Sequence, residues 1–139
     1  MTETIVLDVS AALPWCFEDE ATVDSAKLLD TVAAGHIVVP GIWHIEMLNV
    51  LLQAERRQRI TQTETQAFLE LLDRLVVETD HESQTTARVG VLRMARAHRL
   101  SGYDTTYLEL AHRRGIRLAT RDKALQQAAG QAGVTLIEA

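Results

Sequence analysis

The sequence predicts an α/β fold of three layers, with a central parallel sheet of four to five strands, helices on both faces of the sheet and a helical arm. The first observation is the run Ile5-Val6-Leu7, whose apolar residues are typical of a strand buried on both faces. The second is that such runs alternate along the chain with helical segments, which indicates a parallel sheet. The third is that the middle of the chain has more helices than a regular alternation of strands and helices requires, which indicates a helical arm.

The predicted elements begin and end at residues with known preferences for those positions. Ser10 is a good N-cap for the first helix, and Pro40 closes the second strand. Thr61-x-x-Glu64 has the pattern of a capping box, and Gly115 follows a helix as its C′ residue. Strands are expected at residues 5–7, 37–40, 76–79, 116–119 and 134–137, and helices at 11–17, 24–34, 42–57, 61–76, 83–98, 102–114 and 121–130.

Length and composition predict a single domain over residues 1–139. The chain is long enough to bury its own core, and 47% apolar with 24% charged residues is ordinary for a globular protein. The one cysteine, Cys16, cannot form an internal disulfide, so a reducing cytoplasm is the natural setting. We expect no membrane contact, because the N-terminus lacks the basic region of a signal peptide and no apolar segment approaches the ~20 residues of a membrane span.

The formal net charge of −5 argues against a basic coat that binds nucleic acid through excess Lys and Arg. It does not exclude a site where divalent cations supply positive charge locally. The arginines occur in groups within residues 56–59, 88–99 and 113–117, and a solvated helix end or face is favoured for each group taken alone.

Two predicted strands end in an Asp with a hydroxyl residue beside it. Asp8 and Ser10 follow the first strand, and Thr120 and Asp122 follow the strand at 116–119. In open α/β sheets, ligands bind outside the carboxyl ends of the strands, so both positions suit a site. Two structural alternatives stay open: Asp8 as a loop residue that bonds backbone N–H groups, and Asp122 as the cap of the next helix.

A third carboxylate, Asp104, lies on the apolar face of the helix predicted at 102–114. Tyr107, Leu108 and Ala111 follow it at i+3, i+4 and i+7. An unpaired carboxylate buried there costs several kcal/mol, which favours a functional site over a structural role. The alternative is a helix that starts late, with Asp104 as its N-cap.

A fourth carboxylate, Glu46, lies in a narrow polar stripe of the helix predicted at 42–57. Asn49 belongs to the same stripe, and apolar residues cover most of the remaining surface. Such a helix is mostly buried, so the stripe faces either bulk water or a polar cleft. This helix alone does not decide between them.

Four carboxylates that converge repel one another and raise each other's pKa unless cations neutralise them. No Lys or Arg occupies the same positions. Mg²⁺ or Mn²⁺ fits oxygen ligands, whereas five histidines without paired ligand spacing and a single cysteine disfavour zinc. Two such ions about 3.5–4 Å apart suit phosphoryl chemistry, because they can activate a water and stabilise the leaving oxygen.

Four segments carry a common pattern: Ile5-Val6-Leu7-Asp8-Val9-Ser10-Ala11, Pro40-x-x-Trp43-x-x-Glu46-x-x-Asn49-x-Leu51, Tyr103-Asp104-x-x-Tyr107-x-x-Leu110-Ala111 and Thr120-Arg121-Asp122-x-x-Leu125. In order, length and spacing, and over nearly the whole chain, they resemble PIN-domain ribonucleases. Within that family the sequence is similar to the VapC toxins of bacterial and archaeal toxin–antitoxin pairs.

The resemblance implies a PIN fold and a metal-dependent endoribonuclease that leaves 5′-phosphate and 3′-hydroxyl ends on tRNA, rRNA or mRNA. It also implies a homodimer and a VapB-like antitoxin whose tail enters the active-site groove, commonly with an arginine. Arg121 is a candidate for guiding phosphate, with a solvated surface side chain as the alternative. By this resemblance the residues that are catalytic and bind Mg²⁺ or Mn²⁺ are Asp8, Glu46, Asp104 and Asp122, supported by Ser10, Asn49 and Thr120.

Two other functions stay open at this point. The first is a non-catalytic module on the same scaffold that binds RNA or protein, against which the complete acidic set argues. The second is a phosphatase or phospho-receiver with acidic residues at strand ends. A haloacid-dehalogenase-type phosphatase needs Asp-x-Asp after the first strand, where Ser10 takes the second position. A receiver needs a late lysine, for which Lys123 is the candidate.

Overall fold

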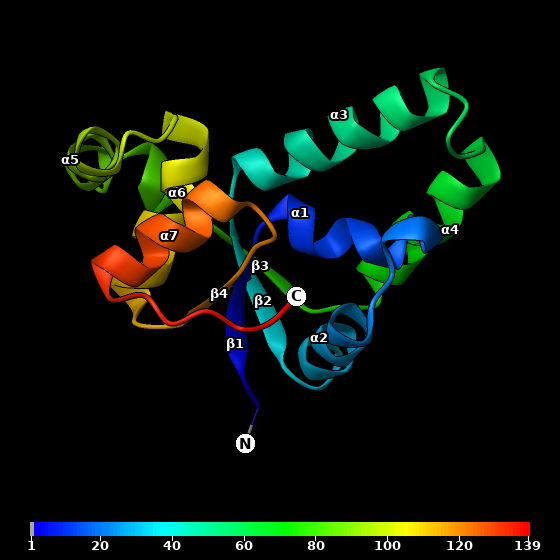
Figure 1. The fold of residues 1–139 in the computed structure, drawn as a ribbon, viewed down its shortest axis with the longest axis horizontal. Coiled ribbons are helices and arrows are strands. Elements are labelled where there is room, and N and C mark those ends of the chain that lie inside the picture. Colours follow the sequence, from blue (N-terminus) through cyan, green and yellow to red (C-terminus); the bar gives the residue numbers. More distant parts are fainter. Residues whose placement is uncertain (1) are drawn as a thin grey trace.

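The computed structural model describes residues 2–139, and within them four parallel strands form one sheet in the order β3-β2-β1-β4 (Figure 1). β1 lies inside the sheet, since Val6 pairs with Val38 on one side and with Leu118 on the other. The apolar residues of β1 are completely buried, as expected for a strand covered on both faces. The strands are β1 (Thr4–Leu7), β2 (His36–Pro40), β3 (Val77–Asp80) and β4 (Arg117–Ala119).

Helices cover both faces of this sheet and confirm the predicted three layers. In Figure 1 the sheet stands between α5, α6 and α7 on one side and α1 and α2 on the other, while α3 and α4 extend outward as an arm. The α-helices are α1 (Val9–Ala12), α2 (Val23–Ala34), α3 (Ile42–Arg56), α4 (Gln62–Asp73), α5 (Arg88–His98), α6 (Gly102–Arg114) and α7 (Lys123–Ala132), and the 3₁₀ helices are η1 (Leu13–Trp15), η2 (Glu18–Glu20) and η3 (Glu82–Gln84).

The two predicted capping signals have different outcomes. Thr61 caps α4 in a complete capping box with Glu64, as predicted. The prediction of Ser10 as an N-cap is wrong: α1 begins at Val9 and its N-cap is Asp8. The Ser10 hydroxyl instead donates to the Asp8 carboxylate at 2.6 Å. A hydrogen bond to a charged carboxylate is stronger than one between neutral groups, so this bond is preferred.

The predicted strand at 134–137 is reduced to one bridge between Leu118 and Leu136. Since β4 has only three residues, it offers little edge for a fifth strand. Leu118 still donates to the Thr135 carbonyl at 3.0 Å and accepts from the Ile137 N–H at 3.1 Å. This last segment therefore follows the sheet without extending it.

Helix ends account for the other differences between prediction and structure. The helix predicted at 11–17 changes into the 3₁₀ helix η1 at Pro14, which has no N–H to donate. The helix predicted at 83–98 is divided into η3 and α5. α7 runs past Gly130 and ends at Gly133, whose φ of 76° is the left-handed conformation that ends many helices. Across residues 2–139 no helix combines the length and apolar content needed to span a bilayer.

A buried ion cluster ties the edge strand β3 to α6. Asp80, the last residue of β3, is 2% exposed, and its carboxylate lies 2.9 Å from the Arg113 guanidinium. Arg113 also bonds the buried Glu109 at 3.0 Å, and Arg114 reaches Asp80 at 3.3 Å. Hydrogen bonds from Arg113 to Glu109 and Asp80 raise the pKa of Arg113 and keep it charged. Asp80 is thus a strand-end carboxylate that the fold neutralises.

Replacing this arginine tests how much the cluster stabilises the fold. We expect Arg113→Met to lower the free energy of unfolding in urea by about 2 kcal/mol or more, because two buried carboxylates lose a charged partner. The matched control Arg93→Met, at an exposed arginine of α5, changes it by less than about 0.5 kcal/mol. Equal stability of the two variants would contradict a stabilising role for the cluster.

Candidate active site

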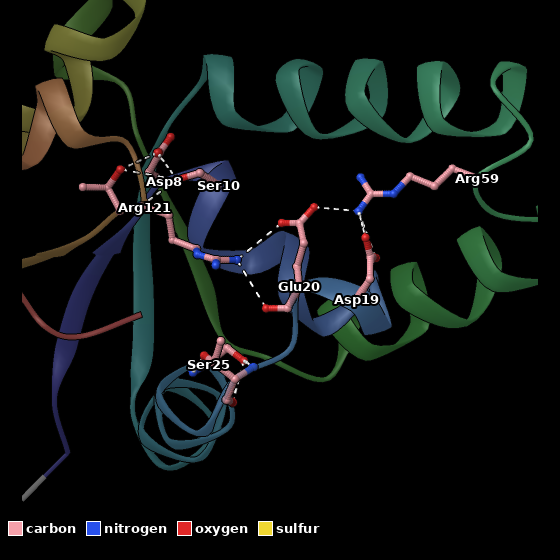
Figure 2. A network of polar contacts seen from close by, with 9 residues as sticks. Asp8, Ser10, Asp19, Glu20, Ser25, Arg59 and Arg121 are labelled. Atoms are coloured by element: carbon pink, nitrogen blue, oxygen red, sulfur yellow. Dashed lines mark hydrogen bonds and ion pairs between the residues drawn. The ribbon is translucent and has the colours of Figure 1, made fainter.

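Asp8 is at the centre of a polar cluster at the carboxyl end of β1. It is 7% exposed, and its backbone N–H donates to the Ala119 carbonyl at 3.0 Å, which places it beside the end of β4. Its Oδ2 accepts from Ser10 Oγ at 2.6 Å and from Thr120 Oγ1 at 2.7 Å (Figure 2). These two donors fix the orientation of the carboxylate. Within residues 2–139, its Oδ1 accepts no hydrogen bond from the protein.

The hydroxyls of Ser10 and Thr120 join the loop after β4 to the start of α1. Thr120 is buried, and its Oγ1 lies 3.3 Å from Ser10 Oγ. Ser10 Oγ accepts the Arg121 N–H at 2.9 Å, and Thr120 Oγ1 accepts the Asp122 N–H at 3.1 Å. Both hydroxyls therefore orient the backbone that carries Asp122 as well as the carboxylate of Asp8.

Glu46 reaches this cluster from α3 and is half-buried. Its Oε1 accepts a hydrogen bond of 2.9 Å from the hydroxyl of Tyr107, a completely buried residue of α6. Burial raises the pKa of Glu46, and the charges of Asp8 and Asp104 raise it further, while the Tyr107 bond opposes them. Burial and the Glu46 charge also raise the pKa of Tyr107, so the phenol remains a donor.

Asp104 reaches the cluster from the first turn of α6. Burial raises its pKa most, followed by the charges of Asp122 and Asp8, and a hydrogen bond to Ser101 opposes these effects. The alternative of Asp104 as an N-cap is wrong, because Ser101 is the N-cap and accepts the Asp104 N–H at 3.1 Å. Asp104 lies in the first turn of α6, as the predicted helix over 102–114 implies.

Asp122 and Asn49 lie at the rim. Asp122 is exposed and caps α7, its Oδ1 accepting the Leu125 N–H at 2.9 Å, so the structural alternative for this residue is realised. Its charge nevertheless raises the pKa of Asp104, so capping and proximity to the cluster coexist. Asn49 is exposed one turn beyond Glu46 and makes no hydrogen bond within the part of the chain that is described.

Arg121 is turned toward Glu20 of η2. Its Nη1 lies 3.4 Å from the Glu20 carboxylate and 3.4 Å from the Glu20 carbonyl (Figure 2). Glu20 is held in turn by Arg59 at 2.8 Å, and Arg59 also pairs with Asp19 at 3.0 Å. Arg121 therefore does not neutralise Asp8, although its backbone N–H is part of the same hydrogen-bond network.

The oxygen atoms of the four carboxylates are the type of ligand that a hard divalent cation prefers, but the carboxylates lie too far apart to bind one ion together. Carboxylate oxygens are the preferred ligands of Mg²⁺ and Mn²⁺, and no ion pair among residues 2–139 involves the four carboxylates. The pKa values of Glu46 and Asp104 are raised first by burial and then by the charges of neighbouring carboxylates. In the described range, however, no three His, Cys, Asp or Glu side chains are close enough together to bind one ion.

Two contacts of the site were not predicted from the sequence. The hydrogen bond of the Tyr107 hydroxyl was missed because the spacing places Tyr107 on an apolar helix face. A buried tyrosine nevertheless usually has a hydrogen-bond partner for its hydroxyl. The pairing of Arg121 with Glu20 joins residues 101 positions apart, and no local pattern indicates it.

Fold and site together define an α/β protein that gathers acidic side chains from four segments at the carboxyl edge of a parallel sheet. A family model described as PIN domain matches residues 5–131. The chain belongs to the PIN domain family, whose members are generally nucleases, and this confirms the resemblance carried by the four segments.

Solved structures share the fold at low sequence identity. The crystal structure of PAE2754 from Pyrobaculum aerophilum matches with a TM-score of 0.69 and 21% identity, over 99% of this chain and 92% of that one. FitAcB from Neisseria gonorrhoeae matches with a TM-score of 0.59 and 18% identity, over 96% of each chain. No curated protein matches the sequence.

The raised carboxyl pKa values predict how stability depends on pH. Between the ordinary and the raised pKa, the folded chain binds more protons at Asp104 than the unfolded chain does, so this group destabilises the fold increasingly as pH rises. Without divalent ions, we expect Asp104→Asn to become more stable than the wild type as pH rises from 3.8 toward neutrality, measured by urea unfolding with a chelator. The control Asp30→Asn, at an exposed residue of α2, follows the wild type. A less stable Asp104→Asn at neutral pH would contradict a raised pKa of Asp104.

The bond between Tyr107 and Glu46 gives a second prediction. Because this bond lowers the pKa of Glu46, we expect Tyr107→Phe to raise that pKa further. The measurement is an NMR titration of the Glu46 side-chain carboxyl carbon. Tyr103→Phe, at the exposed tyrosine of the same helix, is the matched control and leaves the titration unchanged. A lower pKa in Tyr107→Phe would rule out the bond as an influence on Glu46.

Proposed function

We propose that this chain is a metal-dependent endoribonuclease and the toxin of a VapBC-type toxin–antitoxin module. The observation that carries the proposal is the mutual electrostatic effect of carboxylates from separate segments, none of them paired with a basic side chain among residues 2–139. Membership of the PIN family, generally a family of nucleases, supports it. An acidic site can bind the negatively charged RNA backbone when bound cations supply positive charge between the carboxylates and the phosphate.

In this proposal Asp8, Asp104 and Asp122 hold Mg²⁺ or Mn²⁺, and Glu46 serves as a ligand or as the base for the attacking water. The bound ions supply charge neutralisation of the phosphate and lower the pKa of water. Ser10 and Thr120 keep Asp8 in one orientation through their hydrogen bonds to Oδ2.

Glu46 is suited to proton transfer because burial brings its pKa toward working pH. Tyr107 holds one oxygen of Glu46, and the other oxygen accepts no hydrogen bond within residues 2–139. As base, Glu46 would take a proton from the attacking water as the water oxygen bonds to phosphorus. The bond from phosphorus to the 3′ oxygen would break, and the leaving 3′ oxygen would take up a proton from solvent. The products are a 5′-phosphate and a 3′-hydroxyl. Asn49, exposed one turn away, is available to a phosphate or a water.

The proposal includes RNA as substrate (tRNA, rRNA or mRNA), a homodimer of one domain per chain over residues 1–139, a VapB-like antitoxin and a cytoplasmic location. An exposed apolar stripe on the outer face of α3 supports protein partners. Ile45, Leu48 and Leu52 repeat there at helical spacing and are 68%, 45% and 47% exposed. An antitoxin arginine that enters the acidic cluster would relieve the repulsion that raises the pKa of Glu46 and Asp104.

Cleavage of total cellular RNA with Mg²⁺ or Mn²⁺ tests the proposal. We expect the wild type to cut, and Asp8→Asn and Asp104→Asn to lose about 100-fold or more of the rate while remaining folded, because each removes a charged ligand. The control Asp30→Asn removes one exposed carboxylate far from the cluster in sequence and keeps full activity. Equal cutting by all variants, or RNA binding without any cutting, would overturn the nuclease assignment.

A further inference from the structure

We propose that a cavity beside the acidic cluster is a nucleobase-binding subsite in which Tyr103 is the stacking surface. The cavity has a volume of about 500 Å³ and lies between the starts of α3 and α6 and the 3₁₀ helix η3. Its walls include Pro40, Ile42, Gln84 and Tyr103. The inference rests on the proposed nuclease function and names the part of the RNA that the chain holds next to the cleavage site.

The cavity shares its two helices with the acidic cluster. Tyr103 directly precedes Asp104 in α6. Ile42 opens α3 and lies one turn before Glu46, on the same side of that helix. A nucleotide whose phosphate binds at the cluster can therefore place its base in the cavity, since the starts of α3 and α6 border both.

The walls suit the uncharged, flat part of a nucleotide. Tyr103 is 63% exposed although it is a large aromatic residue, and Pro40 and Ile42 add apolar surface. No lysine or arginine of the described chain lines the cavity, so nothing in it would select a phosphate. Every base presents a π-face, and stacking on an aromatic side chain strengthens binding whatever the base.

Gln84 provides a donor and an acceptor for the edge of the base. Its side-chain amide lies against Gly41, where a Cβ would come within 2.4 Å of Gln84 Nε2, so a larger residue at position 41 would displace this amide. Within residues 2–139 this amide makes no hydrogen bond, although the Gln84 carbonyl accepts one from Arg88. A free amide beside an exposed aromatic ring is how proteins commonly read unstacked bases in single-stranded RNA.

The apolar stripe of α3 is a separate surface. Ile45, Leu48 and Leu52 do not line the cavity, and they have no free amide beside them. The cavity combines an aromatic ring and an exposed amide with walls from the two helices that carry Glu46 and Asp104, which favours a base over a protein partner.

The test compares AMP with ribose 5-phosphate, which lacks the base, on the full chain by NMR chemical-shift titration. We expect Tyr103→Leu to weaken AMP binding about tenfold and to leave ribose 5-phosphate unchanged, because only the base stacks. Tyr103→Phe keeps the ring and binds AMP as the wild type does. Leu92→Ala, at an exposed apolar residue of α5, is the matched control. In Gln84→Ala, the relative affinities for AMP, GMP, CMP and UMP change.

Unchanged AMP binding by Tyr103→Leu would overturn the subsite. So would light scattering showing that Tyr103→Leu shifts the oligomeric state while AMP binds as before, since the cavity would then be an interface between copies. RNA cleavage measured on the same samples separates the two proposals. A wild type that cuts RNA, with AMP binding independent of Tyr103, refutes the subsite alone, whereas a wild type that does not cut refutes the nuclease.

Discussion

The carboxylates at the end of β1 repel one another, and the buried sheet holds them together against that repulsion. The apolar residues of β1 are completely buried and the strand is paired on both sides, so Asp8 cannot move away without unpairing strands. α3 and α6 bring Glu46 and Asp104 near it through buried faces that include Met47, Tyr107 and Leu108. The free energy of apolar burial thus maintains a concentration of negative charge that these side chains would avoid by themselves.

The ion cluster around Asp80 shows that two carboxylates at strand ends of the same sheet have different partners. Asp80 and Asp8 both occupy the carboxyl ends of strands, and both are buried. The fold gives Asp80 two arginines, whereas it gives Asp8 two hydroxyls that orient the charge without cancelling it. Arg121, the basic residue nearest to Asp8 along the loop after β4, is held instead by Glu20. Among the described residues, the negative charge at the end of β3 is therefore balanced by arginines, whereas no ion pair balances the charge of Asp8 at the end of β1.

Apolar periodicity predicted the elements whose faces are buried, and it failed where ends depend on single contacts. α6 has the predicted bounds, since Gly115 takes the left-handed conformation expected of it. Ser10 was misassigned because its preference for capping competes with a nearby carboxylate. The sequence singled out Asp8, Asp104 and Asp122 as candidates because strand ends and an apolar helix face are poor places for charge, whereas the polar stripe around Glu46 left its surroundings undecided. The partners of Glu46 and Arg121 could not, because those contacts join residues 61 and 101 positions apart.

The hydroxyl network has a consequence for protein synthesis. Thr120 bonds Asp8 across 112 residues, and Asp122 lies on the same late loop. A nascent chain that has not released β4 from the ribosome has neither of these residues in place, and its first strand lacks one neighbour. The acidic cluster is therefore assembled only after β4 and the loop that follows it have left the ribosome and reached β1.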